Sequence, residues 1–190
     1  MNRICLTVVL LLLSNFLLAS APKVLIVYHS ETGNTETMAH AVRDGVLSVE
    51  GVQAVLKSAE DASTQDLLDA HAIIVGSPVY NANVSPPISA FISSWPFEDQ
   101  PLKGKIGAAF VTAGGVSSGE EITQMNILQS MLIFGMIVMG GPDWSTPFGA
   151  SAIRGNDFFP YDEPIHPGFI KKGNDLGQRV AETVVKMNIE

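Results

Sequence analysis

Cysteine and basic residues are the scarcest features of this 190-residue chain. Its single cysteine, Cys5, lies in an apolar leader, so we exclude disulfide and thiol chemistry for the rest of the sequence. Lys and Arg number 11 against 19 Asp and Glu, for a formal net charge of −8. A surface this acidic repels nucleic acid and anionic membrane surfaces, so we expect neither as a partner.

Two common phosphate-binding motifs are also absent. No Gly-Lys-Ser/Thr follows the first predicted strand, which excludes a nucleoside triphosphatase loop. No Gly-x-Gly-x-x-Gly follows it either, which excludes the dinucleotide fingerprint. The histidines show no metal-ligand spacing, so we expect no metal site; they are His29, His40, His71 and His166.

The first 21 residues differ from the remainder. They combine Arg3, an apolar run over 4–13 and small residues at 19–21. This pattern is typical of a secretory signal peptide, although retention as a membrane anchor stays open. We therefore expect an exported, periplasmic or secreted protein, or an anchored one, with a single domain over 22–190.

The most informative stretch begins at Lys23. Residues 24–28 are almost all apolar, which predicts a strand buried on both faces. A short polar loop follows, and a helix is predicted from about residue 35. Hydroxyls, a glycine without a Cβ and free N–H groups at a helix N-terminus bind phosphate without lysine. This pattern favours a monophosphate site over an ordinary strand-turn-helix junction. The residues expected to hold the phosphate are Ser30, Thr32, Gly33, Asn34 and Thr35.

Apolar periodicity predicts five strands that alternate with five helices. The strands are expected at 24–28, 52–56, 72–76, 105–112 and 136–139. An irregular section over 140–168 precedes the closing helix. The alternation predicts an α/β fold with a doubly wound five-stranded parallel sheet, order 2-1-3-4-5, and helices on both faces. The loops at 29–35, 77–85 and 112–119 then meet at the carboxyl ends of the strands, where we expect the ligand.

The loop Ser30-Glu-Thr-Gly-Asn-Thr35 resembles the FMN-phosphate loop of the flavodoxin-like superfamily. Residues 76–83, 110–115 and 147–153 resemble segments of tryptophan-repressor-binding-protein-like NAD(P)H:quinone oxidoreductases and NADPH-dependent FMN reductases. The resemblance covers most of 23–186 and implies FMN as the cofactor, with its phosphate on the loop. It also implies contacts to the isoalloxazine ring and ribityl chain from Pro78, Val79, Tyr80, Asn81, Thr112, Ala113, Gly114 and Gly115.

The ring loops favour an enzyme over a carrier. Hydride transfer needs a nicotinamide or quinone flat on the flavin, within about 3–3.5 Å, so one ring face must be open. Tyr80 is the one aromatic in these loops, and 113–115 cannot cover a face. We predict a two-electron, NAD(P)H-dependent reductase of quinone-like acceptors, with flavin-centred chemistry and no assigned catalytic side chain.

An exported flavodoxin-like electron carrier with a redox partner protein is the alternative, because free NAD(P)H is not expected outside the cytoplasm. A homo-oligomer is possible in either case. The family's histidine before the fifth strand is missing here, so the resemblance assigns no substrate-handling histidine to this chain. The family's arginine-aromatic pair is replaced by Tyr80-Asn81, which weakens the argument for nicotinamide-phosphate recognition.

Three minor hypotheses complete the predictions. The Gly-x-Ser-x-Gly at 115–119 formally allows a serine hydrolase with Ser117, Asp143 and His166. Trp95 or Phe97 can approach the ring, although packing is the more common role of such aromatics. Residues 157–168 form either a lid over the ring or a packed surface loop, and we favour the latter.

Overall fold

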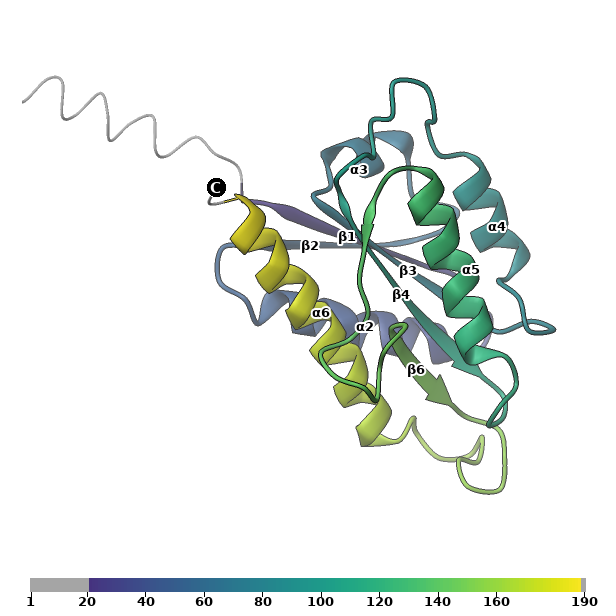
Figure 1. Cartoon of the computed structure of the whole chain (residues 1–190). Coiled ribbons are helices and arrows are strands. Elements are labelled where there is room, and N and C mark those ends of the chain that lie inside the picture. The colour runs from purple at the N-terminus through teal and green to yellow at the C-terminus, as the bar shows by residue number, and fades with distance from the viewer. Residues whose placement is uncertain (1–20, 189–190) are drawn as a thin grey trace, which may run out of the picture.

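The structure is a computed structural model that describes residues 21–188, so the predicted leader lies outside the described residues except for Ala21. No helix within 21–188 combines the length and the apolar character needed to span a membrane. The elements, in chain order (Figure 1), are β1 (Lys23–Tyr28), α2 (Asn34–Leu47), β2 (Gln53–Ser58), α3 (Thr64–Asp69), β3 (Ala72–Pro78), α4 (Pro86–Ser93), β4 (Ile106–Ala113), α5 (Glu120–Ile133), β5 (Ile137–Val138), β6 (Ala150–Ile153) and α6 (Pro167–Asn188).

The parallel sheet has the predicted order β2-β1-β3-β4-β5, which confirms the doubly wound fold class. Its outer position beyond β4 is shared by two short segments. β5 pairs with the start of β4 at Ile106, and β6 pairs further along at 110–113. The expectation of five strands with an irregular section over 140–168 is therefore wrong, because that section contains β6. The strand escaped notice because Ala150 and its neighbours form no long apolar run.

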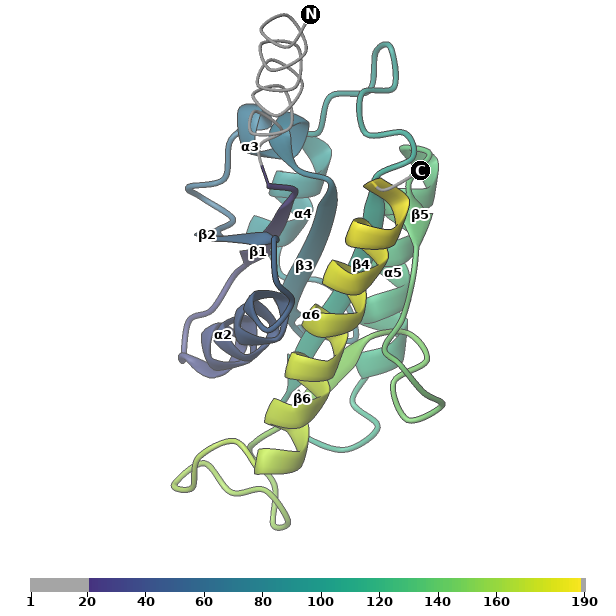
Figure 2. The same cartoon turned by 90° about the vertical axis from the view of Figure 1, so that its left-hand side faces the viewer.

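Helices cover both faces of the sheet. α2 and α6 lie side by side on one face, and α3, α4 and α5 lie on the other (Figures 1 and 2). In β1, Val24 and Ile26 pack towards the first layer, whereas Leu25 and Val27 pack towards the second. Burial on both sides explains why β1 is apolar at every central position.

The backbones of α2 and α6 approach each other closely. A Cβ on Gly177 of α6 would stand 2.0 Å from the carbonyl oxygen of Val42 in α2. A Cβ on Gly45 of α2 would stand 2.0 Å from the carbonyl oxygen of Asn174 in α6. Two glycines thus let the helix backbones touch at reciprocal points, and this contact holds the body of α2 against the sheet.

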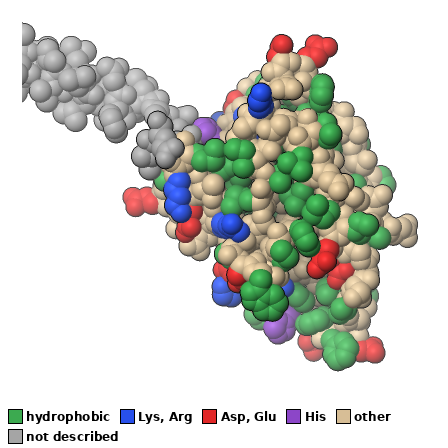
Figure 3. Space-filling model, in the orientation of Figure 1, with side chains coloured by type: hydrophobic (Ala, Val, Ile, Leu, Met, Phe, Trp, Pro, Cys, Tyr) green, Lys and Arg blue, Asp and Glu red, His purple; other side chains and the backbone are tan. Residues whose placement is uncertain are grey.

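The outer face of α5 carries large exposed apolar side chains, among them Ile122, Leu132 and Ile133. Figure 3 shows many hydrophobic side chains over this side of the molecule. Burial of such side chains commonly drives association. The structure contains one chain, so the homo-oligomer stays a prediction.

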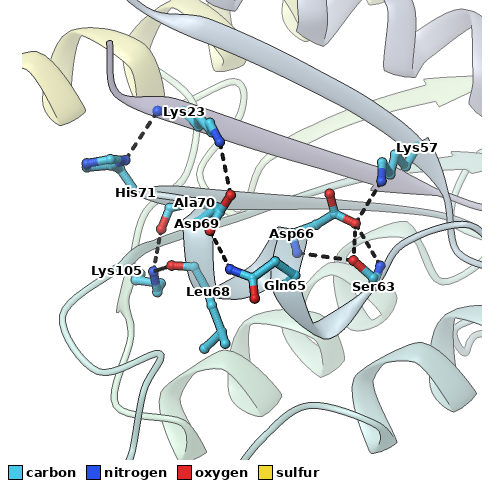
Figure 4. Close-up of polar contacts among 10 residues, drawn as sticks. All are labelled: Lys23, Lys57, Ser63, Gln65, Asp66, Leu68, Asp69, Ala70, His71 and Lys105. Carbon is cyan, nitrogen blue, oxygen red and sulfur yellow. Dashed lines mark hydrogen bonds and ion pairs between the residues drawn. The ribbon is translucent and has the colours of Figure 1, made fainter. Parts of the chain in front are cut away.

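At the N-terminus of α3, one carboxylate gathers several donors. The carboxylate of Asp66 accepts hydrogen bonds from the Lys57 ammonium at 2.8 Å and from the hydroxyl and N–H of Ser63 (Figure 4). Ser63 and Asp66 form a capping box. Burial alone would raise the pKa of Asp66, but the bonds from Lys57 and Ser63 outweigh it and lower this pKa to about 2.

We expect the Asp66→Asn variant to lose about 1–2 kcal/mol of unfolding free energy at neutral pH, after allowance for partial exposure. A folded-state pKa below the unfolded value of 3.8 stabilises the protein above that pH, and the contribution is lost as pH falls towards about 2. Urea denaturation at a series of pH values measures this. The parent should lose stability over that window, whereas Asp66→Asn should lose less. Equal slopes for both proteins would contradict the assignment, and Glu50→Gln, at an exposed turn, is the control.

Candidate functional site

A cavity of about 260 Å³ lies at the carboxyl ends of the central strands, where this fold class binds ligands. A second cavity, of about 390 Å³, opens beside His71 and Lys105 at the amino ends of β3 and β4, away from the predicted loops. The residues that line the first cavity are Glu31, Thr32, Asn34, Thr35, Pro78, Val79, Tyr80, Thr112, Ala113, Gly114, Ala152, Arg154, Tyr161 and Ile165.

Most of the predicted site residues therefore lie around one space. Thr32, Asn34 and Thr35 come from the turn before α2 and its first residues, and the others come from the ends of β3 and β4. Four predicted residues do not line the cavity: Ser30, Gly33, Asn81 and Gly115. Gly33 instead turns the chain into α2, with φ of 82°, a conformation that suits glycine.

The start of α2 has the features of an anion site. No side chain caps the helix N-terminus, so its first N–H groups remain available. A Cβ at Gly33 would meet no atom within 4 Å, which leaves open space beside the turn. The hydroxyl of Ser30 is shielded from solvent and has no hydrogen-bond partner. A phosphate fits these donors, because an anion at a helix N-terminus satisfies N–H groups that otherwise lack partners.

A buried pair of hydroxyls links this turn to the next loop. Oγ1 of Thr35 lies 2.7 Å from Oγ1 of Thr112, and both side chains are buried. A hydroxyl donates one hydrogen bond and accepts others. If Thr112 donates to Thr35, then the Thr35 hydrogen is free to reach an anion in the cavity.

The loop after β3 presents Tyr80 and turns sharply behind it. Tyr80 pairs with Asn83 through two backbone hydrogen bonds, and Asn81 and Ala82 between them have φ of 53° and 58°. Asn81 lies within this tight turn and does not line the cavity. Burial, followed by a hydrogen bond and the charge of Glu31, raises the pKa of the Tyr80 hydroxyl, so the phenol stays protonated at neutral pH.

Five cavity residues were missed in the sequence analysis: Glu31, Ala152, Arg154, Tyr161 and Ile165. Ala152 belongs to β6, which pairs with β4. Arg154 comes directly after β6, and its backbone N–H extends the pairing by donating to the Ala113 carbonyl. Glu31 lies inside the predicted phosphate loop, and Ala152 lies in the family-like segment 147–153. Tyr161 and Ile165 lie in the segment 157–168 that was considered as a lid, so Arg154 is the one residue of the five without a signal in the sequence. Arg154 reaches the cavity because β6 pairs with β4 over a long sequence distance.

The segment 157–168 is neither a simple lid nor a simple surface loop. Tyr161 and Ile165 line the cavity, whereas Phe159 packs edge-on against His166 and Phe169. The Tyr161 hydroxyl lies 3.4 Å from where a Cβ on Gly114 would stand. A second aromatic therefore joins Tyr80 at the cavity, and the argument for an open ring face cannot rest on Tyr80 alone.

Trp95 and Phe97 belong to packing at the far end of α4. Trp95 is buried between Phe91 and Phe134, with ring centroids 5.6 and 5.2 Å apart. Phe97 also rests on Phe134. Neither lines the cavity, which agrees with the packing role favoured above.

The hydrolase residues are engaged elsewhere. Asp143 accepts from the N–H and hydroxyl of Ser145, and Nδ1 of His166 accepts from the Gly168 N–H. Ser117 is exposed in the loop before α5. Among these described residues no hydrogen bond joins two members of the supposed triad, so the geometry does not support a serine hydrolase. Within 21–188, no three His, Cys, Asp or Glu side chains are grouped to hold a metal ion.

Comparisons with known proteins agree with this geometry. Residues 53–151 match the family model of NADPH-dependent FMN reductases. The chain is 37% identical over 128 residues to a flavodoxin of Aquifex aeolicus, which covers 64% of this chain and 66% of that protein. It is 28% identical over 200 residues to an NAD(P)H dehydrogenase (quinone) of Azorhizobium caulinodans, covering 87% and 98%. The fold is similar to a WrbA-like flavodoxin structure from Agrobacterium tumefaciens, with TM-score 0.68, 21% identity and coverage of 87% and 98%.

Proposed function

This chain belongs to the flavodoxin-like family of NADPH-dependent FMN reductases, and from that premise we propose that it binds FMN in the cavity and reduces quinones or similar acceptors with electrons from NAD(P)H. The observation that carries the proposal is the cavity itself. It joins an uncapped helix N-terminus to the ends of β3 and β4, so one site can hold both ends of a flavin nucleotide.

Different residues of the cavity then bind the phosphate and the ring of the flavin. The first N–H groups of α2 and the hydroxyls of Thr32 and Thr35 hold the phosphate, and Thr112 orients the hydroxyl of Thr35. Pro78 and Tyr80 on one side, with Gly114 on the other, frame the isoalloxazine ring. Bound FMN supplies the capacity to take up and pass on two electrons, and the protein supplies orientation and exclusion of water.

Gly114 decides how close a second ring can come. It has no side chain, it lines the cavity and it is exposed to solvent, so we infer an approach to the flavin there, bordered by the Tyr161 hydroxyl. A nicotinamide must stack at about 3–3.5 Å for hydride transfer, and small displacements are costly. We expect the Gly114→Leu variant to slow reduction by NADH or NADPH about 100-fold.

The test loads the protein with FMN under anaerobic conditions, adds NADH or NADPH and follows the visible absorbance of the flavin. Bleaching within seconds in the parent supports the reductase. Gly114→Leu should remain rapidly reducible by dithionite, and Gly115→Leu is the matched control because Gly115 does not line the cavity. A parent whose flavin responds to dithionite but to neither nucleotide would contradict the reductase.

That last result would favour an electron carrier, the second candidate function. The similarity to the Aquifex flavodoxin and the presence of Tyr161 as a second aromatic at the cavity both support it. Export of the chain, which we propose from its first residues, would also favour a protein or membrane quinol as the electron donor.

A further inference from the structure

Arg154 is a positive charge that the sequence analysis did not place at the phosphate site. The sequence around the predicted phosphate loop contains no Lys or Arg between Lys23 and Arg43. The structure brings Arg154 to the loop from the end of β6, 120 residues further along the chain. Its Nη1 donates to Oδ1 of Asn34 at 2.6 Å, and its Nη2 donates to the Tyr161 carbonyl oxygen at 2.6 Å.

These two contacts hold the guanidinium in place but leave some of its N–H donors unused. A guanidinium has five N–H donors in a planar fork, and the bonds to Asn34 and Tyr161 use two of them. Nε of Arg154 is shielded from solvent and has no hydrogen-bond partner. A buried donor without a partner carries a desolvation cost that an anion in the cavity can offset. Arg154 is therefore held beside the loop and still has N–H donors available for an anion in the cavity.

The charged side chains around the cavity show what Arg154 can contribute to phosphate binding. Among the described residues that line it, Arg154 is the one cation and Glu31 is the one carboxylate. Glu36 lies in the first turn of α2, and Glu60 pairs with His29, the residue before the predicted phosphate loop. Helix N–H groups and hydroxyls alone would have to hold a dianionic phosphate against these carboxylates. A fixed guanidinium removes that penalty.

From this geometry we propose that Arg154 is a specificity-determining residue that selects a phosphorylated flavin over riboflavin by pairing with the phosphate dianion beside Asn34. The inference rests on the proposed function, because it assumes that the cavity holds a flavin. It assigns the guanidinium to the phosphate end, since its side-chain partner, Asn34, opens α2 at the uncapped N-terminus. Arg154 contacts the ligand only through the phosphate and takes no part in the redox step.

The experiment measures the affinities of the full-length chain for FMN and for riboflavin by quenching of flavin fluorescence. We expect Arg154→Met to weaken FMN binding roughly 10- to 100-fold, which is the usual scale of a hydrogen bond to a charged group. Riboflavin binding should stay as in the parent. FMN affinity of the parent should rise as pH passes the second phosphate ionisation near about 6, and the variant should show a flatter profile.

Two further variants keep the result interpretable. Arg154→Lys retains the charge but not the planar fork, so it should recover part of the FMN affinity. Arg43→Met removes the same charge from the exposed part of α2, where Arg43 pairs with Asp44, and should bind FMN as the parent does. Thermal melts of each variant show whether the fold is retained.

Three outcomes would overturn the inference. If Arg154→Met binds FMN as tightly as the parent, the guanidinium does not contact the phosphate. If FMN and riboflavin lose affinity equally, Arg154 only supports the loop. A parent that binds neither flavin would overturn the proposed function as well, so the two failures are distinguishable.

Discussion

The Thr32→Ala, Thr35→Ala double variant is expected to bind FMN about 100-fold more weakly than the parent. Both hydroxyls lie at the cavity beside the N-terminus of α2, where they can donate to the phosphate. Each hydrogen bond to a charged group contributes about 1.5–3 kcal/mol, so the loss of two amounts to at least about 3 kcal/mol. Titration of the apoprotein with FMN, followed by flavin fluorescence, measures the change.

Thr37→Ala is the matched control for this loss. Its hydroxyl belongs to the same helical turn but donates to the Gly33 carbonyl at 2.8 Å, and the side chain does not line the cavity. It should therefore keep the affinity of the parent. Retention of FMN by the double variant as firmly as by the parent would refute the phosphate site. Thr35→Ala alone also leaves Thr112 without its buried partner, so folding should be checked by circular dichroism.

Gly177→Ala should destabilise the fold by about 3 kcal/mol, which lowers the melting temperature by roughly 6–12 °C for a domain of this size. The added Cβ would stand 2.0 Å from the Val42 carbonyl oxygen, so α6 must move away from α2. Alanine gains about 1 kcal/mol of helix propensity, but this is too small to offset the loss of packing between two helix backbones.

Thermal and urea denaturation test this, with Gly115→Ala as the control. A Cβ on Gly115 meets no atom within 4 Å and its φ is not positive, so the same substitution should leave stability unchanged or slightly higher. Equal stability of Gly177→Ala and the parent would show that α2 and α6 can separate without cost. Because we propose the phosphate site at the N-terminus of α2, we also expect Gly177→Ala to weaken FMN binding.

Local patterns were enough to predict the sheet order and the family, whereas the phosphate loop stays a prediction. β1 is apolar because it is buried on both faces, and such strands are recognisable without tertiary information. The order 2-1-3-4-5 followed from the alternation of strands and helices and is confirmed. The match to NADPH-dependent FMN reductases likewise confirms the resemblance inferred from the loop motifs.

Prediction failed where small residues form structure through pairing alone. β6 consists of Ala-Ser-Ala-Ile and becomes a strand because it pairs with β4 beyond the end of β5. No hydrophobic periodicity in the sequence predicts such a strand. β6 brings Arg154 to Asn34, and the following segment brings Tyr161 to Gly114.

The amino-acid sequence by itself determined the layered α/β fold and the local pattern on which we propose a phosphate site from Ser30 to Thr35, because burial and helix initiation depend on residues close together in the chain. Only the tertiary structure decided the charge and the outer wall of the cavity. Arg154 and Tyr161 come from more than 100 residues beyond the loop, and their arrival depends on β6 pairing with β4. Contacts between segments so distant in sequence depend on the packing of the whole sheet, which local patterns do not encode.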